Sequence, residues 1–116
     1  MDQRMTADEA SRSWRGMTIV VRLAFETDMT TGNCTLVLDL ADGETAGSKA
    51  VSIRFDGVVG LTLKHFGGGL TQILSLEVRD ISDRQWDRQA YEVADQERDG
   101  ISFRCQDYGV ARQYTI

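Results

Sequence analysis

The amino-acid sequence predicts a mainly β fold, an antiparallel sandwich or open barrel of about seven or eight short strands with a short N-terminal helix. From residue 17 onward, apolar and polar side chains alternate with a period of two, which is typical of half-buried strands. Glycine and Asx residues separate these segments, and strand and helix patterns do not alternate as in a parallel βαβ sheet. At 116 residues we expect one core, with residues 1–15 as a polar arm and 16–116 as a single β domain.

The arm carries a helix-start signal. Thr6 and Glu9 have the spacing of a capping box, which predicts a helix over about residues 7–14. Ala10 and Trp14 lie four residues apart and therefore share one face of that helix. We expect Trp14 to pack against the β domain and to tether the arm.

The alternating segments are expected to form the strands, each with its apolar set on one face. In chain order the apolar sets are Ile19, Val21, Leu23 and Phe25; Cys34, Leu36, Leu38 and Leu40; Val51, Ile53 and Phe55; Val59, Leu61 and Leu63; Leu74, Leu76 and Val78; Tyr91 and Val93; Ile101, Phe103 and Cys105; and Val110, Tyr114 and Ile116. Because Cys34 and Cys105 fall in register with core residues, we expect two buried, reduced thiols.

Glycine marks the breaks between strands. Asp56 followed by Gly57 predicts a tight hairpin turn or a bulge. The glycine triplet at residues 67–69 predicts a flexible hairpin tip, with a backbone-lined ligand contact as the alternative. Asp99 and Gly100 predict a turn into the following strand.

The charge balance restricts the classes of partner. The chain has thirteen basic and eighteen acidic residues, a net charge of −5, and nine of the acids with only five arginines lie between Glu77 and Asp107. An acidic chain is poorly suited to nucleic-acid backbones and to anionic membrane surfaces, so we expect neither as a partner. The acidic C-terminal third is either a solvated surface or a face for a basic partner.

The sequence shows no apolar run of the roughly 20 residues that a membrane helix needs. The N-terminus lacks the apolar segment of a secretory signal, and two cysteines are few for a disulfide scaffold. We therefore expect a cytoplasmic protein.

The residues that usually carry catalysis or bind metal are scarce. His65 is the sole histidine, and Cys34 and Cys105 are expected in the core, so we predict no catalytic residue and no enzyme. Three Cys and His residues in total are too few and too scattered for structural zinc. An enzyme that depends on His65 is the alternative.

Residues 95–100 have acids at the first, third and fifth positions and glycine at the sixth, as a calcium-binding loop does. Glu97 stands where such a loop has Asp or Asn, and Gln106 stands at the position of the bidentate carboxylate. We therefore expect an acidic hairpin turn here, and no metal or cofactor.

The exposed-looking candidate for binding lies near a second capping-box spacing, formed by Ser82 and Gln85. This spacing predicts one helical turn that carries Trp86, flanked by Asp83 and Asp87. Tryptophan dominates the energies of many protein interfaces, so we expect these three residues to anchor a partner. The alternative is that Trp86 covers one end of the sandwich.

Four segments together resemble the immunity-protein-type β domains of bacterial polymorphic toxin systems. They are VSIRFDGV at 51–58, LSLEVRDI at 74–81, YEVADQE at 91–97 and ISFRC at 101–105. The resemblance covers about half of the chain and consists of strand and turn patterns. It implies a β domain that neutralises a toxin by binding it.

The sequence hypothesis is therefore a non-enzymatic domain that binds a protein partner, with a basic toxin of the same bacterium as the expected partner. Electrostatic complementarity with an acidic surface would speed that association. The alternatives are a small-ligand or carbohydrate module with a pocket at the glycine-rich end, and a structural or assembly protein that uses an uncovered edge strand. The oligomeric state stays open.

Overall fold

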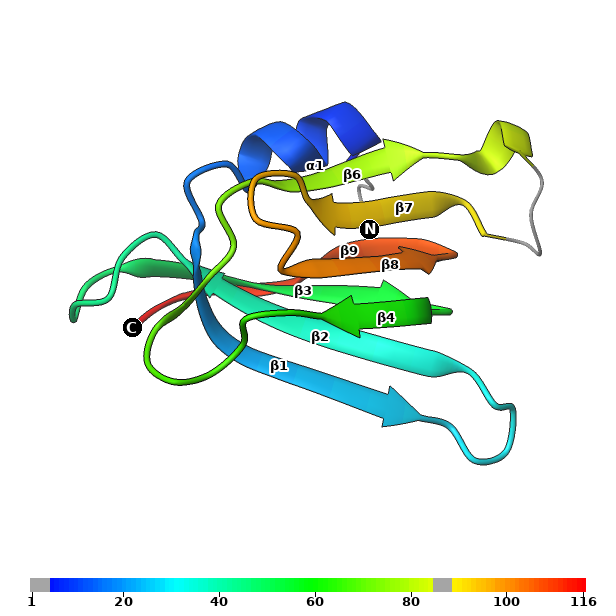
Figure 1. The fold of residues 1–116 in the computed structure, drawn as a ribbon, viewed down its shortest axis with the longest axis horizontal. Coiled ribbons are helices and arrows are strands. Elements are labelled where there is room, and N and C mark those ends of the chain that lie inside the picture. Colours follow the sequence, from blue (N-terminus) through cyan, green and yellow to red (C-terminus); the bar gives the residue numbers. More distant parts are fainter. Residues whose placement is uncertain (1–4, 85–88) are drawn as a thin grey trace.

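The structure is a computed structural model, and it describes residues 5–84 and 89–116. Within these residues the chain forms nine strands in two antiparallel sheets, one α-helix and one 3-10 turn (Figure 1). The sheets pack face to face and neither closes into a barrel, which confirms the predicted antiparallel sandwich.

The larger sheet has the strand order β5-β1-β2-β3-β9. Its strands are β1 (Ile19–Thr27), β2 (Cys34–Ala41), β3 (Lys49–Asp56), β5 (Thr71–Gln72) and β9 (Asp107–Thr115). The smaller sheet has the order β4-β8-β7-β6 and consists of β4 (Val59–Leu63), β6 (Leu76–Asp80), β7 (Tyr91–Asp95) and β8 (Ile101–Cys105). The 3-10 turn η1 (Ser82–Arg84) follows β6.

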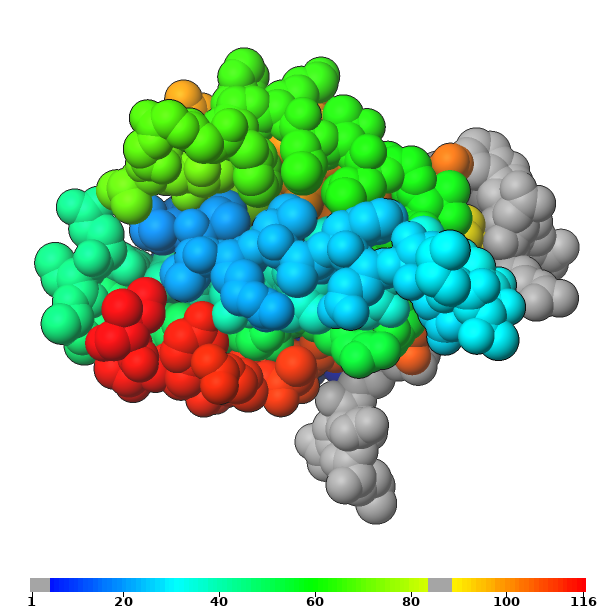
Figure 2. Space-filling model, turned by 90° about the horizontal axis from the view of Figure 1, so that it is seen from below, coloured from blue at the N-terminus to red at the C-terminus, as the bar shows by residue number. Residues whose placement is uncertain are grey.

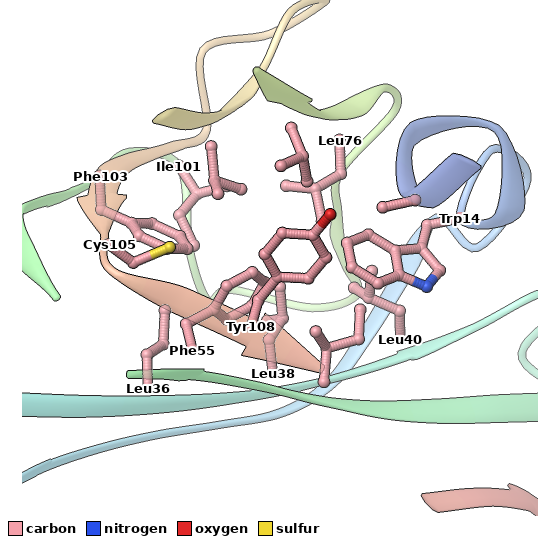
Figure 3. Packing of buried hydrophobic residues seen from close by; sticks show 14 of the residues in the cluster. Trp14, Leu36, Leu38, Leu40, Phe55, Leu76, Ile101, Phe103, Cys105 and Tyr108 are labelled. Atoms are coloured by element: carbon pink, nitrogen blue, oxygen red, sulfur yellow. The ribbon is translucent and has the colours of Figure 1, made fainter. Parts of the chain in front are cut away.

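The core lies between the two sheets and is filled from the alternating positions (Figure 3). Its fully buried side chains include Leu36, Leu38, Leu40, Ile53, Phe55, Val93, Ile101 and Cys105. Phe55 lies at the centre, with its ring edge-on to Phe103 of β8 at 4.9 Å between centroids. The predicted inward faces of β2, β3, β7 and β8 are confirmed.

The helix α1 (Ala7–Ser13) closes one side of the sandwich, as the capping box predicts. The Glu9 backbone N–H donates to the Thr6 hydroxyl, and the Thr6 backbone N–H donates to the Glu9 carboxylate. Trp14 is buried and packs edge-on against Phe55 and Tyr108, with ring centroids 6.3 and 5.9 Å away. The prediction that Trp14 tethers the arm is confirmed.

The helix also covers the outer edge of β6. The Ser11 hydroxyl accepts from the backbone N–H of Val78 at 2.9 Å and donates to the Val78 carbonyl at 3.2 Å. Since β6 pairs with β7 alone, these bonds satisfy one backbone N–H and one C=O on its open side.

The predicted inward face of β1 is wrong in part. A bulge between Val20 and Arg22 shifts the register against β2 and changes which residues face the core. Val20 and Leu23 pack on the core, Ile19 lies on the opposite face, and Val21 stays 46% exposed.

Asp56 and Gly57 do not form a hairpin, because β3 and β4 belong to different sheets. Gly57, with φ of +68°, instead marks the corner at which the chain crosses from one sheet to the other. The alternation predicted for β4 is also wrong, since Val59 and Leu63 are exposed and a bulge lies between Val59 and Thr62. Leu74 is likewise exposed, and its neighbour Ile73 is buried in its place.

Replacing Trp14 with alanine tests whether the helix contributes to the stability of the sandwich. We expect Trp14→Ala to lower the free energy of unfolding by about 3–5 kcal/mol, because it removes a buried aromatic side chain from the side of the core. Urea unfolding followed by circular dichroism measures this loss. The exposed neighbour supplies the control, and Arg15→Ala should change stability by less than about 0.5 kcal/mol. Equal effects of the two variants would contradict the role given to Trp14.

Candidate functional site

One face of the larger sheet packs on the core, and no other element in the described part of the chain covers the opposite face. We call this uncovered side the outer face. Cross-strand pairing arranges its side chains in four rows that run from β1 through β2 and β3 to β9. The rows are Ile19-Ala41-Ala50-Tyr114, Arg22-Asp39-Ser52-Arg112, Ala24-Val37-Arg54-Gly109 and Glu26-Thr35-Asp56-Asp107.

The second row contains a buried carboxylate. Asp39 is 4% exposed, although it lies on the side of the sheet that faces away from the core. One carboxylate oxygen, Oδ2, accepts a hydrogen bond from the Tyr114 hydroxyl at 2.7 Å. The other, Oδ1, has no hydrogen-bond partner among the described residues. A buried acceptor without a partner costs free energy, so the hydrogen bond from Tyr114 is the compensation that the described fold supplies to this carboxylate.

Tyr114 crosses β3 to reach Asp39, and small side chains make this possible. Ala50 pairs directly with Tyr114, and Ala41 lies one strand beyond. The Arg112 guanidinium packs over the Tyr114 ring at 4.2 Å from its centroid. Burial raises the pKa of Tyr114, and the hydrogen bond to the Asp39 carboxylate raises it further.

The fourth row is acidic and lies at the end of the sheet next to the β1–β2 turn. It carries Glu26, Asp56 and Asp107. Arg54 offsets part of this charge, since its Nε lies 3.0 Å from Asp56 Oδ1. The outer face therefore combines a tyrosine and three arginines with four carboxylates, a mixture suited to a protein surface as partner.

The predicted anchor Asp83 lies in η1 and is exposed. Trp86 and Asp87 lie outside the described residues. The described carboxylates of the acidic third do not form one surface, because Asp107 lies in β9 of the larger sheet and the others lie in the smaller sheet and the segments that join its strands. Asp80 and Asp83 lie beyond the end of β6, whereas the β7–β8 turn lies at the opposite end.

Several of these acids already have partners within the fold. Glu92 lies 3.3 Å from Arg79, and Asp99 lies 2.8 Å from Lys64. Asp95 is 2% exposed, and its Oδ1 accepts from the backbone N–H groups of Ser75 and Glu97. Residues 95–100 therefore form a hydrogen-bonded turn, and no cluster of metal-ligating side chains occurs in the described ranges.

The thiols and the histidine do not form a nucleophile–base pair. Cys105 is fully buried, and this burial, followed by the charge of Asp107, raises its pKa to about 12. A thiol with that pKa is protonated at neutral pH and is a poor nucleophile. Cys34 and Cys105 are both free thiols, but only Cys105 is buried as predicted, since Cys34 lies at the start of β2 and is partly exposed. His65 is exposed.

The predicted hairpin tip at the glycine triplet is wrong, because the flanking strands β4 and β5 belong to different sheets. The three glycines are exposed, and a Cβ built on any of them would meet no atom within 4 Å. Two shallow grooves lie elsewhere, beside α1. One, of about 500 Å³, includes Trp14 and Tyr114 in its lining, and the other, of about 730 Å³, lies between α1 and β6.

A family model described as immunity protein PIM8 matches residues 11–111. The chain belongs to this family of immunity proteins. The match begins within α1 and ends within β9, so it includes both sheets. No curated protein and no solved structure matches the chain. No helix in the described part of this immunity protein is long and apolar enough to cross a membrane.

The sequence alone did not predict a candidate binding surface on the outer face of the larger sheet. Asp39 reads as the polar member of an alternating strand, and Tyr114 reads as an apolar residue that faces the core. The signal that could have revealed the face is the run of small or polar residues Ala41, Ala50 and Ser52 at outward positions. Such positions leave room for a long side chain from a neighbouring strand.

The Tyr114–Asp39 hydrogen bond is tested by Tyr114→Phe. We expect a loss of about 1–2 kcal/mol in the free energy of unfolding at pH 7, because the buried carboxylate loses its hydrogen-bond donor. Tyr91→Phe is the matched control, since the Tyr91 hydroxyl makes no hydrogen bond within the described residues. Folding raises the pKa of Tyr114 above the value of about 10 that tyrosine has in the unfolded chain. The hydroxyl therefore adds to the free energy of unfolding below pH about 10, and this stabilisation is lost as the pH rises through the higher pKa of the folded state. Stability curves for wild type and Tyr114→Phe should therefore converge above that pH, and a constant gap would contradict the assignment.

Proposed function

We propose that this chain neutralises a bacterial toxin by binding it directly, without catalysis, in the cytoplasm. The observation that carries the proposal is the immunity-protein family match over residues 11–111. Immunity by binding requires a stable fold and an accessible surface, and it requires no catalytic group. A rigid two-sheet core with one uncovered sheet face meets both needs.

We propose the outer face as the surface that contacts the toxin. Arginine and tyrosine are enriched among the residues that dominate interface energies, and this face presents Arg22, Arg54, Arg112 and Tyr114. Asp39 lies buried beside Tyr114 on this face, and the hydrogen bond between them holds the Tyr114 hydroxyl in place.

We propose that the toxin presents a basic surface. The net charge of −5 supports this, because opposite net charges accelerate the encounter of two proteins. The acidic fourth row of the outer face adds local complementarity. Binding should therefore weaken as salt rises.

Trp86, Asp83 and Asp87 remain a second proposed anchor. Their support is the residue types and, for Asp83, an exposed position in η1. If this corner contributes, Trp86→Ala should weaken the complex by about 2 kcal/mol.

The first test is capture of the partner from lysate of the source organism at low and high salt, with the bound proteins identified by mass spectrometry. We expect one stoichiometric basic protein, released by salt. With the captured protein in hand, Arg54→Ala should weaken the complex by about 2 kcal/mol, roughly thirtyfold in Kd, in a calorimetric titration.

Arg79→Ala is the matched control for Arg54→Ala. Both arginines lie in strands on outward sheet faces, both form one ion pair, and their side chains are 55% and 58% exposed. We expect Arg79→Ala to change affinity by less than about 0.5 kcal/mol. Equal effects of the two variants would remove the outer face from the proposal. A folded bait that captures no partner while the candidate toxin is expressed would contradict the function itself.

A further inference from the structure

One edge of the larger sheet is open over most of its length. β5 pairs with β1 only at Ile19 and Val20, so the edge from Val21 to Thr27 has no strand beside it in the described chain. These seven residues form no backbone hydrogen bond outside their own sheet within residues 5–84 and 89–116. Figure 2 shows β1 across the middle of this side, between β4 with its following segment and the C-terminal strand β9.

The other long edges carry features that discourage strand pairing. Ser11 of α1 bonds to the open side of β6. β4 is interrupted by a bulge beside Gly60, and β9 by a bulge opposite Ser52 and Ile53. From Arg22 to Thr27, by contrast, β1 pairs regularly with β2 and contains no proline or lysine. An edge of this kind is a template for another strand.

The β1 edge is apolar on one face and charged on the other. Phe25 is 45% exposed and Val21 is 46% exposed. Arg22 and Glu26, on the outer face, are exposed and form no ion pair in the part of the chain that the structure describes. Within residues 5–84 and 89–116, the edge therefore has neither a backbone partner nor charge partners.

We propose that two copies of this chain associate by antiparallel pairing of their β1 edges, centred on Ala24. Ala24 is the midpoint of the open segment, so this pairing uses all seven residues. It places Arg22 of each copy opposite Glu26 of the other, and Leu23 opposite Phe25. Directly opposed charges of unlike sign, and opposed apolar side chains, stabilise antiparallel strand pairs.

Neighbouring registers do not give this match. In a symmetric antiparallel pair, a two-fold axis perpendicular to the sheet passes through a residue that lies opposite its own copy, and it keeps outward residues opposite outward residues. The two nearest alternatives to Ala24 for this central residue are therefore Leu23 and Phe25. A centre at Leu23 sets Glu26 against Val20, whose edge β5 already occupies. A centre at Phe25 sets Arg22 against Asp28, whose carboxylate already accepts from the backbone of its own turn.

The paired copies form one continuous sheet in which both outer faces lie on the same side. The dimer therefore leaves Arg54, Arg112 and Tyr114 of both copies accessible. The pairing shares Arg22 and Glu26 with the outer face, whereas Arg54, Arg112 and Tyr114 lie away from the β1 edge. Variants of Arg54 therefore test the toxin contact without changing the pairing, and each proposal can fail without the other.

Sedimentation equilibrium of the full chain tests the association. We expect the wild type to dimerise with rising concentration, and Arg22→Glu and Glu26→Arg each to weaken dimerisation by about tenfold, since each sets like charges opposite one another twice. An equimolar mixture of the two variants should recover the dimer, because every opposed pair is then complementary. A wild type that stays monomeric at all accessible concentrations would overturn the proposal and leave the edge to a strand of another protein. A mixture no better than either variant would overturn the register.

Disulfide cross-linking tests the centre independently of the charge variants. In a Cys34→Ser background, we expect Ala24→Cys to form an intermolecular disulfide under mild oxidation, because the two copies of position 24 lie directly opposite one another. Glu26→Cys is the control on the same strand and face, and its two copies lie too far apart to link. Cross-linking of Ala24→Cys alone, read from intact mass on non-reducing samples, supports the pairing. Equal yields, or none at position 24, would overturn it.

Discussion

The structure depends on one aromatic cluster that joins the two sheets and the helix. Phe55 of β3 is fully buried and lies against Phe103 of β8, Trp14 at the end of α1, and Tyr108 of β9. Each sheet supplies part of the cluster, and the helix supplies the rest. Aromatic side chains bury large areas, so these contacts fix both the distance between the sheets and the position of the arm. The Tyr108 hydroxyl adds a hydrogen bond to the Met5 carbonyl, which holds the start of the arm against β9.

The helix α1 covers one side of the sandwich, and partners can therefore contact only the surfaces that it leaves open. The helix covers the side where β6 and β9 meet, and its Ser11 hydroxyl bonds to the β6 edge. Among the surfaces that the described chain leaves uncovered are the outer face of the larger sheet and the open edge of β1. The first presents arginines, Tyr114 and a buried carboxylate, which suits a protein of complementary charge. The second presents unpaired backbone with a self-complementary charge pattern, which suits a second copy. A family member that acts by binding can use both, because Arg54, Arg112 and Tyr114 of the outer face lie away from the β1 edge.

Local signals in the sequence predicted local structure well, and non-local contacts explain what they missed. The capping box of Thr6 and Glu9 and the alternation at Leu36 and Leu38 specify their elements without reference to distant residues. The bulge in β1 could not be predicted, because one inserted residue leaves an alternating pattern intact while it reverses the face. The burial of Asp39 depends on Tyr114, which lies 75 positions away in the sequence. The acidic third looked like one surface because a count of charges does not say where the charges lie. In the fold, Glu92 and Asp99 lie beside basic residues, and Asp80 at the end of β6 lies in a different sheet from Asp107 of β9.

The most direct test of the account is a titration of the purified cognate toxin with this protein while the toxic activity is measured. If the chain confers immunity by occupying the toxin, activity should fall in proportion to the amount added and reach its minimum at a fixed stoichiometry. Inhibition should also weaken in parallel with binding when Arg54 is replaced and persist when Arg79 is replaced. Toxic activity that is unchanged at a large molar excess of folded protein would contradict the claim that this domain neutralises its partner by binding.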